Sequence, residues 1–90
     1  MAEAALGPDH PDVAATLDTM ATFYSNAGYF EKAEPRFRRS MAIYAKISGE
    51  HSLPYAAALE HLAQMFQREH RDDLAAPLLV KSKAIQLKPS

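Results

Sequence analysis

The side chains that could do chemistry in this chain are four histidines and a few charged groups. The histidines include no pair four residues apart and have no cysteine to help them: His10, His51, His61 and His70. A metal site needs three or four ligands in fixed geometry, so we expect no bound metal. The three glycines form no phosphate-binding loop, and no serine stands in a nucleophile motif. The sequence therefore predicts a protein that is not an enzyme and has no cofactor.

Two carboxylates and an arginine run remain as candidates for binding. Asp18 and Glu60 stand at equivalent positions of the repeat described below. They form either an acidic spot that prefers a partner's Lys or Arg, or two solvated charges, which contribute little alone. They lack the apolar surroundings that would tune them for catalysis. Arg36, Arg38 and Arg39 either bind a phosphate or lie on the solvated outer side of a helix.

Length and charge limit the functions that the chain can have. Its 90 residues predict one domain, residues 1–90. A net charge of −1 argues against a nucleic-acid binder or a polybasic membrane patch, because both need excess Lys and Arg. No apolar run is long enough to span a bilayer, and the N-terminus lacks the pattern of a signal peptide. We expect a cytoplasmic protein.

Four helices are predicted from apolar residues that recur at steps of three and four. They run over about Pro11–Ala27, from Phe30 to about Ile47, from about Leu53 to Glu69, and from Asp72 or Asp73 to about Leu87. Gly28 suits the left-handed position that ends the first helix. No segment alternates with period two, so we expect an all-α fold.

The chain matches itself when its numbering is shifted by 42, and a fixed period of this size indicates a repeat protein. The identical pairs are Gly7 and Gly49, Ala14 and Ala56, Ala15 and Ala57, Leu17 and Leu59, Ala21 and Ala63, Ala33 and Ala75, Pro35 and Pro77, Ser40 and Ser82, Ala42 and Ala84, Ile43 and Ile85, and Lys46 and Lys88. Ala21, Ala33 and Ser40, with their counterparts, are expected where paired helices approach closely.

These residues resemble the tetratricopeptide repeat, in the form that kinesin light chains have, whose period is also 42. The opening Leu-Gly-Pro-Asp-His-Pro-Asp-Val-Ala at residues 6–14 is close to that subgroup's usual opening. The signature positions are filled in the first unit by Leu17, Met20, Ala21, Tyr24, Gly28, Phe30, Ala33, Phe37 and Ser40, and in the second by Leu59, Leu62, Ala63, Phe66, Ala75, Leu79 and Ser82. The resemblance implies two helix-turn-helix units, about 6–48 and 49–88, in an α-solenoid. The second unit departs from the pattern, with His70 for the turn glycine and Asp72 for the aromatic.

The resemblance also implies a concave groove, lined by the first helix of each unit, that holds a protein or peptide partner. The matching positions are Asp18, Thr19, Thr22, Ser25, Asn26, Glu60, His61, Gln64, Gln67 and Arg68. The subgroup's usual Asn-Asn is replaced by Asp18-Thr19 and Glu60-His61. The lysine and asparagine clamp for a C-terminal carboxylate is missing, which argues against a receptor for chaperone tails.

The last helix is less polar than its counterpart in the first unit, although a terminal repeat needs a polar outer face. Leu74, Leu78 and Val80 replace Lys32, Arg36 and Arg38, and Ile85 follows them. We therefore predict self-association, as a dimer or with neighbouring repeats, through Leu74, Leu78, Val80 and Ile85. Scattered exposed apolar residues are the alternative. The favoured function is a non-catalytic interaction module, and the alternative is a structural fragment of a longer repeat array.

Overall fold

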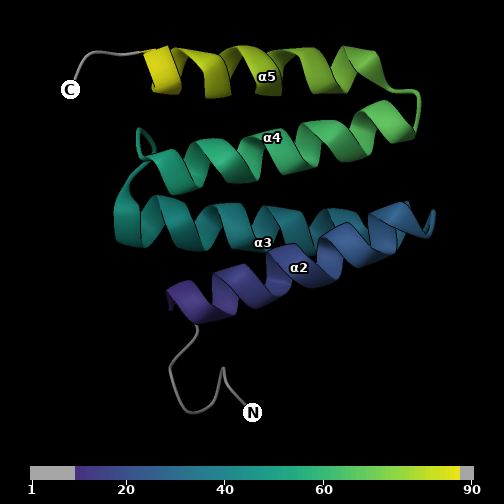
Figure 1. Cartoon of the computed structure of the whole chain (residues 1–90), viewed down its shortest axis with the longest axis horizontal. Coiled ribbons are helices and arrows are strands. Elements are labelled where there is room, and N and C mark those ends of the chain that lie inside the picture. The colour runs from purple at the N-terminus through teal and green to yellow at the C-terminus, as the bar shows by residue number, and fades with distance from the viewer. Residues whose placement is uncertain (1–9, 88–90) are drawn as a thin grey trace.

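The computed structural model describes residues 10–87, which form four helices joined by short turns (Figure 1). Their bounds are Pro11–Asn26 for α2, Phe30–Ser48 for α3, Leu53–Arg68 for α4 and Asp72–Leu87 for α5. These bounds confirm the predicted all-α fold, and no strand occurs in this part of the chain. Residues 6–9 of the opening motif and the repeat match at Lys88 lie outside the described residues.

The first helix of each pair begins in the same way. The Nδ1 atom of His10 accepts a hydrogen bond from the backbone N–H of Asp12 at 3.1 Å. The hydroxyl of Ser52, the repeat equivalent of His10, accepts one from Tyr55 at 3.4 Å. A side chain that accepts such a bond satisfies a free N–H of the first turn. His10 is therefore a helix cap.

The two turns inside the pairs also share one conformation. Gly28, between α2 and α3, has φ of 88°, and His70, at the equivalent position between α4 and α5, has φ of 61°. Glycine adopts this left-handed region freely, whereas a residue with a Cβ atom adopts it at a cost. The loss of the turn glycine thus leaves the path of the chain unchanged.

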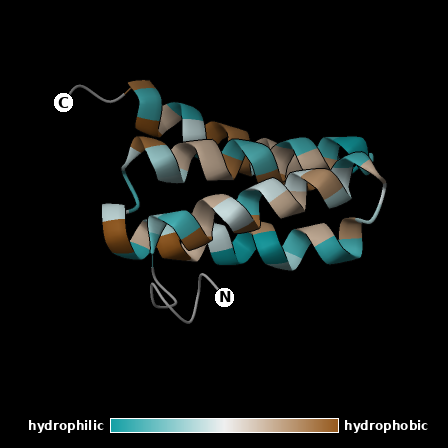
Figure 2. Cartoon of the chain, turned by 60° about the horizontal axis from the view of Figure 1, so that its bottom comes forward, coloured by the Kyte–Doolittle hydropathy of each residue, from teal (hydrophilic) through white to brown (hydrophobic). Residues whose placement is uncertain are grey.

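The helices form a flat, antiparallel array in which α2 packs on α3, α3 on α4, and α4 on α5 (Figure 1). The array measures 38 × 37 × 13 Å. A direct contact between α2 and α4 brings the first helices of the two pairs together. Every helix in Figure 2 carries both polar and apolar residues along its length, as expected for helices that bury one face. None of the described helices is both long and apolar enough for a membrane span.

Small buried residues hold the paired helices close, as predicted. Ala21 and Ala33 are fully buried. Ser40 donates a hydrogen bond from its hydroxyl to the carbonyl of Ala14 at 3.0 Å, and Ser82 does the same to Ala56 at 3.0 Å. Because these two bonds are equivalent under the repeat, both pairs have the same internal packing.

Candidate partner-binding groove

A hollow of about 190 Å³ opens between α2 and α4. Six of the predicted groove residues line it: Thr22, Ser25, Asn26, His61, Gln64 and Arg68. Its other lining residues are Phe37 and Met65, which are buried core side chains. The sequence places Phe37 on the apolar stripe of its helix, but only the fold shows that its ring also lines the groove.

The groove has an apolar base and a polar rim. Phe37, Met65 and the side chain of Ser25 are buried, whereas Thr22, Asn26, Gln64 and Arg68 are exposed. The amides and the guanidinium offer N–H donors, and the amide oxygens and the threonine hydroxyl offer acceptors. This arrangement suits a polar backbone that carries an occasional apolar side chain.

Asp18 and His61 connect α2 to α4 beside the hollow. The Nδ1 atom of His61 lies 2.7 Å from Oδ2 of Asp18. This bond to the carboxylate raises the pKa of His61 from its usual 6.5; partial burial opposes the rise, and the charges of Asp18 and Glu60 add to it. Burial, and then the charge of Asp18, also raises the pKa of Tyr44 on α3.

Glu60 is held by α5. Its Oε2 atom lies 3.0 Å from the hydroxyl of Ser82 and accepts a hydrogen bond from the amide of Gln86. Asp18 and Glu60 are both half-buried and both have partners within the chain. Neither carboxylate is therefore a fully solvated charge, and each is held in place by a contact with another helix.

A family model for tetratricopeptide repeats matches residues 12–88. The chain belongs to this family. A search of curated proteins found no match. Tetratricopeptide repeats generally mediate protein–protein interaction and are typically non-catalytic. Among residues 10–87, no three His, Cys, Asp or Glu side chains lie close enough together to hold a metal ion.

Four predicted groove residues of the tetratricopeptide pair do not line the hollow: Asp18 and Glu60, whose contacts are described above, and Thr19 and Gln67. Thr19 lines a separate hollow of about 330 Å³ on α2, together with Met20, Phe23 and Tyr24. Gln67 is exposed and does not line the groove hollow.

The structure corrects the predicted self-association residues on the last helix of the second tetratricopeptide unit. Val80 is 70% exposed, but Ile85 is only 8% exposed and belongs to a core cluster with Tyr55 and Leu59. Leu74 and Leu78 are half-buried against the core cluster that contains Phe66. Of the four residues, only Val80 is largely exposed to solvent.

The aromatic position of each tetratricopeptide unit explains why Leu74 and Leu78 are apolar. In the first unit, the Lys32 ammonium and the Arg36 guanidinium lie 5.7 and 4.8 Å from the ring centre of Tyr24. The second unit has a buried phenylalanine there, and apolar side chains suit it better than desolvated cations. Arg38 is bound to Glu34 at 2.9 Å, and the Arg36 guanidinium donates a hydrogen bond to the carbonyl of Lys32 at 2.8 Å, so both side chains have partners within α3.

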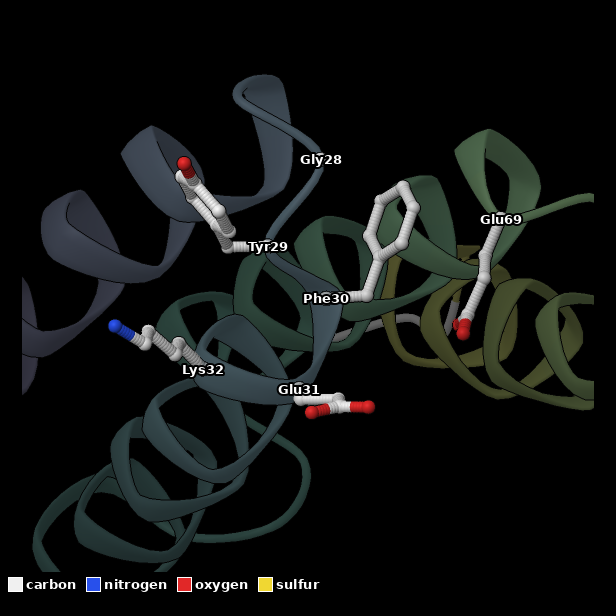
Figure 3. A pocket seen from close by; sticks show the side chains of 6 residues that line it. All are labelled: Gly28, Tyr29, Phe30, Glu31, Lys32 and Glu69. Carbon is white, nitrogen blue, oxygen red and sulfur yellow. The ribbon is translucent and has the colours of Figure 1, made fainter.

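A further hollow, of about 240 Å³, lies at the turn of the first tetratricopeptide unit. Figure 3 shows Phe30 and Glu69 on one side of this turn and Tyr29 and Lys32 on the other. Glu31 and Gly28 complete the lining. It is separate from the groove, and no motif in the sequence pointed to it.

Proposed function

We propose that this tetratricopeptide module binds an extended segment of a partner protein in the hollow between α2 and α4. The observation that carries the proposal is the meeting, in one hollow, of six residues that the family pattern assigns to the groove. They come from both units, so a bound segment would contact both first helices. The rim would hydrogen-bond the segment's backbone through Asn26, Gln64 and Arg68.

The apolar base sets a further requirement on the partner. Phe37 and Met65 lie at the bottom of the hollow, and they would contact one apolar side chain of the segment. A hollow of about 190 Å³ has room for a single side chain of that kind. A suitable segment therefore has one apolar residue that enters the hollow, and its backbone on each side of that residue forms hydrogen bonds with the rim.

Selection from a library of random peptides displayed on phage tests this function. We expect wild-type protein to enrich peptides, and Thr22→Arg, which fills the hollow from an exposed position on α2, to lose their binding. Ala42→Arg is the matched control, because it adds the same side chain at an exposed position on α3 outside the hollow. Binding that survives Thr22→Arg, or that Ala42→Arg abolishes equally, would refute the groove.

Four narrower parts of the proposal rest on particular observations. We propose the kinesin-light-chain-like subtype, because the hydrogen bonds of Ser40 and Ser82 recur with that subgroup's period. The two helix pairs support one domain with repeats at about 6–48 and 49–88. The lack of cysteine supports a cytoplasmic location. We also propose self-association through α5, supported by the exposed Val80.

A second candidate function is that of a structural unit in a longer repeat array. The observation that favours it is the apolar outer face of α2, where Phe23 is 70% exposed. In an array, a preceding unit would cover this face, and the module would act by stacking. Peptide selection separates the candidates, because a purely structural unit would enrich no groove-dependent peptide.

A further inference from the structure

One face of α2 carries large apolar side chains that the described residues leave exposed. Met20 is 39% exposed and Phe23 is 70% exposed, although both are large apolar side chains. Their repeat equivalents on α4, Leu62 and Met65, are both 0% exposed. We call Met20, Phe23 and Tyr24 the leading face, because they stand on the side of α2 where a preceding unit would pack.

The structure shows what covers a face of this kind. On α4, the equivalent of the leading face packs against the first helix pair, through Ala21, Ala33 and Phe37. The ring centre of Phe37 lies 6.5 Å from that of His61, so Phe37 is the large side chain that reaches this face. The leading face would therefore pack against another helix pair that has a large apolar side chain at the position of Phe37.

The second helix pair of the same chain has such a surface. Leu79 on α5 is the equivalent of Phe37, and it is only half-buried. Around it stand Asp72, Lys83 and Gln86, in place of Phe30, Met41 and Tyr44 of the first pair. We call Leu79 with Lys83 the trailing face. Because α2 and α5 do not contact each other, one chain cannot cover its own leading face with its own trailing face.

We propose that copies of this chain stack head to tail, with Leu79 of one copy entering the hollow formed by Thr19, Met20, Phe23 and Tyr24 of the next. This stacking keeps the α5 self-association proposed above but assigns the contact to Leu79 and not to Val80, and it is independent of peptide binding. The contact between copies would have the same geometry as the contact that joins the two helix pairs within one chain. Each copy is then placed relative to the next as the second repeat is placed relative to the first, which is the relation between Ser40 and Ser82.

The charged and polar groups around this contact are compatible with stacking. Between stacked copies, Glu60 of one copy takes the place of Asp18, and Thr19 of the next copy takes the place of His61. A carboxylate then lies beside a hydroxyl. Within the chain, Met41 packs against the cluster that contains Tyr55. Between copies, the equivalent residues are Lys83 of one copy and Val13 of the next. The neighbouring Asp12 side chain is 75% exposed and can attract the Lys83 ammonium. A contact between two different faces is head-to-tail, and when it repeats the step that joins the two helix pairs it builds an open solenoid that adds copies without a fixed limit.

Sedimentation equilibrium over a wide concentration range tests the stacking. We expect the mean mass of the wild type to keep rising with concentration. Phe23→Glu blocks the leading face and Leu79→Glu blocks the trailing face, so each variant alone should be a monomer. An equal mixture should form a one-to-one dimer, because each variant retains the face that the other lacks. A wild type that stays monomeric, or a mixture that stays monomeric, overturns the proposal.

Two further variants control for folding and for the surface that is used. Circular dichroism checks that each variant is helical, and Lys83→Glu, at an exposed position, replaces Leu79→Glu if that variant unfolds. Val80→Glu changes an apolar residue on α5 outside the trailing face and should leave the stacking unchanged. A closed dimer that Phe23→Glu does not affect, or association that Val80→Glu abolishes, would place self-association elsewhere. Wild-type peptide selection tests the groove separately, so either proposal can fail alone.

Discussion

The left-handed turn at His70 is expected to lower the stability of the second helix pair. His70 has φ of 61°, where the equivalent residue of the first pair is Gly28. A Cβ atom in this conformation costs about 1–2 kcal/mol. Glycine would remove this cost, but it adds about 0.5–1 kcal/mol of backbone entropy to the unfolded chain. Because the His70 side chain is exposed, we expect His70→Gly to stabilise the protein by about 0.5–1 kcal/mol on balance.

Thermal unfolding followed by circular dichroism measures this change. For a domain of this size, about 1 kcal/mol raises the Tm by roughly 4–8 °C. His51→Gly is the matched control, because His51 is also an exposed turn histidine but does not have a positive φ. It should leave the Tm unchanged or lower it. A Tm for His70→Gly that is no higher than the wild-type value would refute the reasoning.

Three other predictions follow from buried contacts. The folded-state pKa of His61 is raised. The contribution of protonated His61 to the stability of the folded protein is therefore complete below its usual pKa of 6.5 and is lost as pH rises through the folded-state pKa. Urea titrations of the wild type and His61→Gln should show this loss in the wild type only; parallel pH profiles would contradict it. Ser40→Ala should cost about 1 kcal/mol in urea unfolding, and Ser82→Ala should cost more, because its hydroxyl also contacts Glu60 and Gln86. Equal costs would show that the additional contacts contribute nothing. Ala33→Leu should cost about 1–3 kcal/mol by overpacking, and an unchanged Tm would refute the close approach at that residue.

The helices and their packing could be predicted because they depend on local pattern. The apolar period and the turn residues fixed each boundary to within a residue or so, as at Asn26 and Arg68. The repeat matches at Ala21 and Ser40 identified the close approaches, since a small residue kept at both positions of a repeat indicates limited space. Groove positions such as Gln64 followed from the family pattern, which encodes the relative rotation of the helices.

Contacts between the two helix pairs could not be read from the sequence. The Asp18–His61 bond depends on how far α2 is rotated relative to α4, and neither residue marks that rotation. The same limit explains the error at Ile85. A stripe pattern shows that a residue lies on the apolar side of its helix, but the neighbour that covers it, here Tyr55 with Leu59, is known only from the fold.

The two equivalent serine hydrogen bonds also bear on the order of folding. Ser40 to Ala14 and Ser82 to Ala56 each close a loop of 26 residues. Loop-closure entropy depends on loop length, so this cost is equal for the two helix pairs. Their relative rates of formation then depend on the turn, where Gly28 adopts the left-handed conformation freely and His70 does not. We therefore expect the first helix pair to form faster than the second.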